Sequence, residues 1–248
     1  MSGPSGTGAH LDIGGVFDRT GEIYKKAFGT FWIVALCLLL PAAVVQWLLG
    51  DSGFGGFISW LVNLIASAWL IGSIIRIVQD VEEDGQVDYT VGDLLGSIVP
   101  RLFAIVVLNF LVGLIIGIGL IFLIIPGVIL ALVLAVAMPS LVVEGIGVFD
   151  SMSRSAELTR DNRMRILAVG LLVILIIIGI VAVTFILTMA SPFLGAIGAL
   201  VLGILLYPYL AMLTTVLYFR LVELKEGSVV AVEETVIVEE DAGPPPVV

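Results

Sequence analysis

Six stretches of apolar residues, each close to the length of a membrane-crossing helix, dominate the hydrophobic pattern of this chain. They cover residues 28–49, 57–78, 102–125, 127–143, 166–190 and 193–219, and Arg76 is the one charged residue among them. A helix needs about 20 apolar residues to cross the roughly 30 Å hydrocarbon core of a bilayer. Barrel strands would alternate between apolar and polar residues, and these stretches do not alternate. The pattern therefore predicts an all-α fold, a polytopic six-helix transmembrane bundle.

Proline and glycine mark the predicted reversals of the chain between these helices. The third and fourth stretches are separated only by Pro126 and Gly127, and together they are too long for one crossing at about 1.5 Å per residue. Pro-Gly is strong turn chemistry. We predict a tight hairpin there and another at Ser191 and Pro192.

Three shorter segments, one before each pair of spans, carry apolar residues at helical spacing with charged residues beside them. Thr90 followed by Asp93 is typical of a capping box at the start of the second segment. We predict three cytoplasmic amphipathic helices in the headgroup layer, with a docking surface for another protein as the alternative. The predicted apolar faces are Ile13, Val16, Phe17, Thr20, Tyr24, Ala27 and Phe28; Val91, Leu94, Leu95 and Ile98; and Val148, Phe149, Met152, Ala156 and Thr159.

The basic residues are confined to alternate connections between the spans. Three precede the first span, two bound the link between the second and third, four lie between the fourth and fifth, and two follow the sixth, which accounts for all 11. Lys and Arg are retained on the cytoplasmic side of a membrane. We therefore predict a multi-pass protein of the cell membrane whose N-terminus and C-terminus are both cytoplasmic.

Composition and charge narrow the class of protein further. Hydrophobic residues make up 60% of the 248 residues and charged residues 13%, whereas a soluble domain carries about 25% charged residues. The net charge of −10 opposes binding to nucleic acid, whose phosphates would repel the chain. We predict a flexible leader over 1–11, a membrane domain over 12–226 and an acidic disordered tail over 227–248.

Reactive side chains are scarce. His10 is the only histidine and Cys37 the only cysteine, which excludes a two-histidine metal site, a Ser-His-Asp triad within the bundle and a CxxC pair. We expect Cys37 to be a small buried hydrophobe. The sequence therefore predicts no catalytic, cofactor-binding or metal-binding residues, no cofactor and no enzyme activity.

The apolar stretches contain a few polar or helix-breaking residues. The polar ones are Asn63, Asn109, Thr184, Thr188, Tyr207 and Tyr209; we expect hydrogen bonds between helices, with the lining of a substrate path as the alternative. Pro41, Pro139 and Pro208 predict kinks, or alternatively a broken-helix ion site. Gly113 and Gly117 have the spacing of a close helix contact.

Glu144 ends the fourth stretch just before a segment with four arginines. We predict a salt bridge from Glu144 to Arg154 that anchors the third amphipathic helix. Joint binding of a lipid headgroup by Glu144 and those arginines is the alternative.

Three short motifs are similar to a known family. They are Tyr24-Lys-Lys-Ala-Phe28, Ile125-Pro126-Gly127-Val128, and Glu144-Gly145 followed by the segment from Ser151 to Arg160. Over 12–226 the chain resembles the membrane domain of the glycerophosphoryl diester phosphodiesterase membrane-domain family, including its stand-alone bacterial inner-membrane proteins. The resemblance implies membrane placement. In that family hydrolysis belongs to a separate barrel domain with acidic and histidine residues, which we expect to be absent here.

The leading hypothesis is a non-catalytic integral membrane protein that organises or binds lipids, or a partner protein, at the cytoplasmic membrane. The alternative is a transporter or channel for a small solute or a lipid. The expected partners are membrane lipids and a partner membrane protein or a second copy of the chain, and no nucleic acid.

Overall fold

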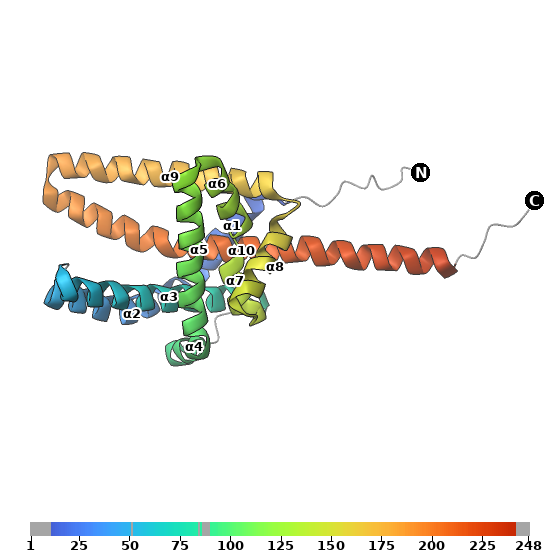
Figure 1. Cartoon of the computed structure of the whole chain (residues 1–248), viewed down its shortest axis with the longest axis horizontal. Coiled ribbons are helices and arrows are strands. Elements are labelled where there is room, and N and C mark those ends of the chain that lie inside the picture. Colours follow the sequence, from blue (N-terminus) through green and yellow to red (C-terminus); the bar gives the residue numbers. More distant parts are fainter. Residues whose placement is uncertain (1–10, 51, 84, 86–89, 242–248) are drawn as a thin grey trace, which may run out of the picture.

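The computed structural model describes residues 11–50, 52–83, 85 and 90–241, and describes no side chain at 192, 196–197, 199–204 or 227–241. The described residues are all-α and contain no strand (Figure 1). The helices are α1 (Ile13–Lys26), α2 (Phe28–Leu49), α3 (Gly53–Glu83), α4 (Val91–Ile98), the 3-10 turn η1 (Val99–Arg101), α5 (Leu102–Phe122), α6 (Ile124–Val133), α7 (Ala137–Glu144), α8 (Val148–Thr159), α9 (Arg163–Ala190) and α10 (Pro192–Asp241).

Six helical segments in the described part of the chain are long and apolar enough to cross a membrane. They are Phe28–Leu49, Gly53–Glu83, Val91–Phe122, Ile124–Glu144, Arg163–Ala190 and Leu205–Glu226. The first has the predicted bounds, and each of the others overlaps its predicted stretch. The predicted fold class is confirmed, and the chain is a multi-pass integral membrane protein.

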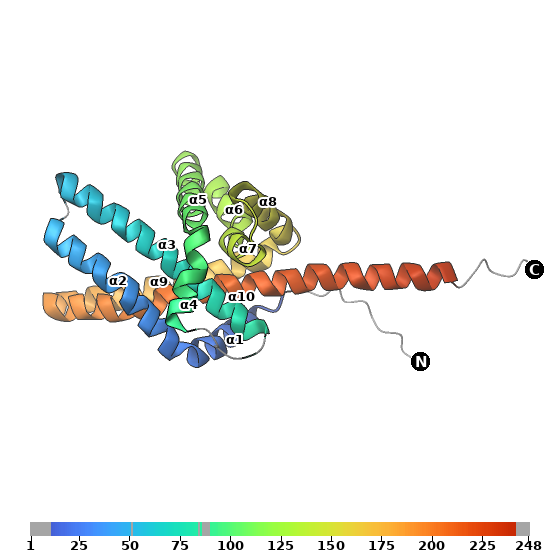
Figure 2. The same cartoon turned by 90° about the horizontal axis from the view of Figure 1, so that it is seen from below.

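The spans form three hairpins, α2–α3, α5–α6 and α9–α10, which diverge from a common base. In Figures 1 and 2 the turns of the three hairpins lie far from one another. At the base, α1 and α8 pack on α10 while α4 and α7 pack on α3. The core lies there, with Ile23, Leu94, Leu158 and Val216 all fully or almost fully buried. The outer halves of the hairpins expose apolar side chains, as helices do when lipid covers them.

The apolar faces predicted for α1 and α4 face the protein interior, except that Phe28 at the end of the first is 43% exposed. Val16, Thr20 and Ile23 of α1 are buried, and Leu94 and Ile98 of α4 are buried. The predicted N-cap at Thr90 is confirmed, because its hydroxyl oxygen accepts a hydrogen bond from the Asp93 amide at 3.3 Å. The placement of these helices in the headgroup layer stays a prediction.

The face predicted for α8 was correct only in part, because Thr159 is fully buried and Val148 and Met152 are partly buried. The buried residues of α8 are Ser151, Ser155, Leu158 and Thr159, whereas Phe149, which the prediction placed on the buried face, is 76% exposed. The helix turns its small hydroxyl side chains inward because they allow a close approach to the break between α6 and α7, where Ser155 makes two hydrogen bonds.

The chain reverses between α5 and α6 at Leu123 rather than at Pro126. Leu123 is extended (φ −160°, ψ 131°), and Pro126 lies in the first turn of α6, where a missing N–H costs nothing. The close helix contact is also displaced from its predicted place. A Cβ on Gly119 would lie 2.9 Å from the Gly127 Cα, while a Cβ on Gly113 or Gly117 would meet nothing within 4 Å. The reversal at Ser191 is confirmed.

The fourth span, which was predicted as one helix, is broken between Val133 and Ala137. Pro139 has no N–H for the Ala135 carbonyl, and its ring crowds that carbonyl. The other two intramembrane prolines behave differently, because Pro41 lies within α2 and Pro208 within α10 without ending either helix. The expectation of simple kinks is therefore wrong for Pro139.

The predicted ends of the membrane domain also differ from the structure. Residues 1–10 of the predicted leader lie outside the described residues, but Leu11 is only 2% exposed, and its carbonyl accepts a hydrogen bond from Arg165 at 2.5 Å. Helix α10 continues to Asp241 where the sequence predicted a disordered tail. No proline lies between Pro208 and Pro244, so no residue in this stretch forces the helix to end.

Candidate functional site

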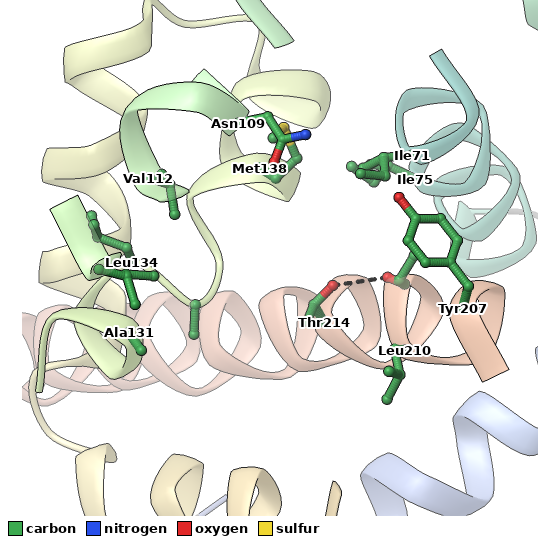
Figure 3. Close-up of a pocket in the computed structure, with 13 residues that line it drawn as sticks. Ile71, Ile75, Asn109, Val112, Ala131, Leu134, Met138, Tyr207, Leu210 and Thr214 are labelled. Atoms are coloured by element: carbon green, nitrogen blue, oxygen red, sulfur yellow. Dashed lines mark hydrogen bonds between the residues drawn. The ribbon is translucent and has the colours of Figure 1, made fainter. Parts of the chain in front are cut away.

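A cavity of about 360 Å³ lies between α3, α5, the α6–α7 segment and α10 (Figure 3). Its lining is almost entirely apolar and includes no charged side chain. The polar lining residues are Asn109, Tyr207 and Thr214. The apolar ones are Ile71, Ile75, Val112, Ile116, Ala131, Leu134, Ala135, Met138, Leu210 and Ala211. Residues from four predicted spans meet here, which no local sequence pattern could indicate.

The polar side chains of the cavity are not equivalent. The Thr214 hydroxyl donates to the Ala211 carbonyl of its own helix at 2.9 Å. The Asn109 amide and the Tyr207 hydroxyl point toward the same space beside Ile71 and Ile75 (Figure 3), and neither hydrogen-bonds to any other described residue. Asn109 and Tyr207 therefore offer unused hydrogen-bonding groups to whatever fills the cavity.

Most of the other polar side chains predicted at membrane depth form hydrogen bonds with the backbone of their own helix. Asn63 donates to the Ser59 carbonyl at 3.0 Å, and Thr184 and Thr188 donate to carbonyls three or four residues earlier. Only Tyr209 reaches another helix, with its hydroxyl 3.5 Å from the Phe17 carbonyl. The prediction of bonds between helices was therefore wrong for Asn63 and the threonines, because short side chains reach their own helix backbone first.

A second cavity of about 280 Å³ shares Tyr207 with the first. It lies between α2, α3 and α10, and its lining also includes Pro208 and Ser67. The tyrosine ring thus borders both spaces. The two cavities flank the contact between α3 and α10.

The break in span four borders the first cavity and is held by Ser155. Its hydroxyl donates to the Val133 carbonyl at 2.7 Å and accepts from the Val136 amide at 3.2 Å. Ser155 itself is fully buried. Since Leu134 and Ala135 lie in the broken segment and line the cavity, α8 positions part of the cavity wall.

The predicted salt bridge between Glu144 and Arg154 is confirmed. Glu144 Oε1 lies 2.9 Å from Arg154 Nε and also accepts from the Tyr218 hydroxyl at 2.8 Å. Arg154 contacts a second carboxylate, Glu226, at 3.2 Å. The hydrogen bond to Glu144 is the main cause that raises the pKa of Arg154. With these carboxylates around it, Arg154 joins α7, α8 and α10, which favours the salt bridge over headgroup binding.

Gly145 ends α7 in the left-handed conformation (φ +70°). The guanidinium of Arg101 donates to the Val142 carbonyl, and a Cβ on Gly145 would lie 2.6 Å from Arg101 Nη2. Glycine is therefore favoured at this position for its backbone conformation, and any larger residue would also have to displace the guanidinium of Arg101.

We expect Gly145→Ala to lower the thermal unfolding midpoint of the detergent-purified protein. The left-handed conformation costs alanine about 1–2 kcal/mol, and the clash with Arg101 adds to this. Gly85→Ala is the matched control, since Gly85 has φ +81° but nothing within 4 Å of an added Cβ. Equal losses in the two variants would show that the contact with Arg101 does not matter.

Other candidate residues do not form a reactive site. Cys37 is exposed on the outer face of α2, so the prediction that it is buried was wrong. His10 lies outside the described residues. In the part of the chain that the structure describes, no group of three or more His, Cys, Asp or Glu side chains could hold a metal ion.

Comparison with known proteins gives a family but no structural relative. No solved structure matches the chain. A family model, described as an uncharacterised protein family (UPF0259), matches residues 55–224, which include both residues of the predicted salt bridge and every lining residue of the cavity that contains Asn109. This match provides no link to the phosphodiesterase membrane domain that the short motifs resemble. Because the match covers more than half of the chain, the protein belongs to the uncharacterised protein family UPF0259.

Proposed function

We propose that this protein is a non-catalytic membrane protein that binds a mainly hydrocarbon molecule of the bilayer in the cavity lined by Asn109 and Tyr207. The observation that carries the proposal is the apolar cavity of about 360 Å³ among the membrane-crossing helices. Ligand sites are typically apolar clefts of about 300–1,000 Å³ with a few placed polar groups. The cavity has both properties.

The lining also favours a lipid over the ion or small solute of the transporter hypothesis. Ion-handling sites within a membrane usually contain ionisable side chains, and none lines this cavity. An apolar ligand would enter sideways from the bilayer, between hairpins whose outer surfaces are already apolar. The proposal includes two further predictions from the sequence. Both termini lie in the cytoplasm, and the chain is related to the phosphodiesterase membrane domain, as the motifs Ile125–Val128 and Glu144-Gly145 suggest.

Filling the cavity should remove the bound lipid. We expect Ala131→Phe, which places a ring in the space between α6 and α10, to reduce co-purifying lipid several-fold without unfolding the protein. Mass spectrometry of lipid extracted from the purified protein measures this effect. Ala182→Phe makes the same change on the exposed face of α9 and should leave the amount unchanged. Equal lipid content in the two variants and the parent chain would refute the proposal.

A further inference from the structure

Asn109 and Tyr207 place unused hydrogen-bond donors inside the apolar cavity. An asparagine amide has two N–H donors and a tyrosine one O–H donor. Asn109 is half-buried and Tyr207 is 42% exposed, so within a membrane their polar groups face hydrocarbon wherever no protein atom covers them. A polar group without a partner in hydrocarbon costs several kcal/mol, and no described residue bonds to either side chain. Thr214, by contrast, has already used its hydrogen on the Ala211 carbonyl. A ligand that brings an acceptor to this depth would satisfy both groups.

The direction of the two side chains restricts where that acceptor lies. In Figure 3 the Asn109 amide and the Tyr207 hydroxyl approach the space beside Ile71 and Ile75 from different helices, and Met138 lines the same cavity. One helix, α5, contributes the amide and another, α10, contributes the hydroxyl. An acceptor between them would also contact apolar lining residues of the cavity, including the polarizable thioether of Met138.

The chemistry excludes a charged ligand and makes a phospholipid chain a poor fit. A charge would be buried in a lining without a counter-ion, which is expensive. The polar groups of a phospholipid lie at the membrane surface, so its acyl chain alone would leave both donors unpaired. The ligand must be neutral, largely hydrocarbon, and carry an acceptor oxygen at the level of the membrane interior.

Resting on the proposed function, we propose that the cavity binds a neutral isoprenoid-quinone-type lipid whose carbonyl oxygen accepts hydrogen bonds from Asn109 and Tyr207. The ring occupies the space beside Ile71, Ile75 and Met138. Its hydrocarbon tail extends past the ring of Tyr207, which also borders the second cavity of about 280 Å³. This molecule meets both requirements, because its polar oxygens are carried by an otherwise apolar body.

The test uses the full chain in phospholipid nanodiscs, titrated with decylubiquinone and followed by quenching of tryptophan fluorescence. We expect saturable binding that weakens about 2- to 10-fold in Tyr207→Phe and in Asn109→Leu, the effect of losing one hydrogen bond. Tyr209→Phe and Asn63→Leu are matched controls, since these side chains bond to backbone carbonyls at Phe17 and Ser59. Both controls should bind like the parent chain.

Decylbenzene, which has a similar ring and tail but no oxygen, separates this inference from the proposed function. We expect it to bind more weakly than the quinone and equally to parent, Tyr207→Phe and Asn109→Leu proteins, which also shows that the variants are folded. Equal affinity for the two probes would overturn the carbonyl contact while leaving the hydrocarbon site intact. Tighter binding of dioctanoylglycerol would overturn the quinone assignment. If Ala131→Phe affects no probe, the proposed function itself fails.

Discussion

Replacing Ser155 by alanine is expected to destabilise the protein strongly, although the change removes one oxygen atom. The hydroxyl bridges the Val133 carbonyl and the Val136 amide across the break in span four. The Val136 amide would be left without its partner in a fully buried place, and the Val133 carbonyl in a partly buried one. Each unsatisfied group costs about 1–3 kcal/mol, so the combined loss is a large part of the stability of a typical domain.

The measurement is the thermal unfolding midpoint of the detergent-purified protein, compared with that of Ser153→Ala. Ser153 lies on the same helix but is exposed, so its loss should change the midpoint little. Ser155→Cys, which retains a weak donor and acceptor, should fall between the parent and the alanine variant. A midpoint for Ser155→Ala as high as that of Ser153→Ala would show that the break does not depend on this hydroxyl.

Gly127→Val is expected to disrupt the α5–α6 hairpin. A Cβ at Gly127 would lie 2.6 Å from the backbone nitrogen of Leu120 and equally close to the Leu120 side chain. A clash with backbone cannot be relieved by a change of rotamer, so the two helices must separate. Overpacking in well-packed proteins costs about 1–3 kcal/mol and occasionally more.

The control for this variant is Gly113→Val. An added Cβ at Gly113 meets nothing within 4 Å, so the same substitution within α5 should be tolerated. We expect the amount of folded, monodisperse protein after purification to fall several-fold for Gly127→Val and to stay near the parent level for Gly113→Val. The reverse order would mean that the Gly113-xxx-Gly117 spacing, and not the Gly119–Gly127 contact, holds this hairpin.

Several features were readable from the sequence because one physical constraint acts on short stretches of chain. Hydrocarbon thickness sets the length of a span, so the bounds of α2 were predicted at both ends. Turn chemistry placed the reversal at Ser191, and capping chemistry placed the start of α4 at Thr90. Opposite charges on either side of a short connection predicted the pair of Glu144 and Arg154.

Where two physical constraints act on the same residues, the prediction from the sequence was wrong or incomplete. Pro126-Gly127 has turn chemistry, but proline is equally suited to the first turn of a helix. In the structure both residues lie in α6, where Gly127 packs closely against α5. In α8 the apolar spacing correctly placed Thr159 inside, but it missed Ser155, which is buried because its hydroxyl pairs with the backbone of the broken span. The spacing of apolar residues within one helix does not indicate that the backbone of another segment needs hydrogen-bond partners.

The sequence by itself thus determined that the chain is a six-span helical membrane protein, because apolar length and backbone satisfaction in lipid are properties of each segment alone. Only the tertiary structure decided where the fourth span breaks, which glycines touch, and that Asn109 and Tyr207 face one cavity. These features depend on how the hairpins diverge from the base. The separation of the hairpins is set by packing between residues far apart in the chain, and it cannot be predicted from any single stretch of sequence.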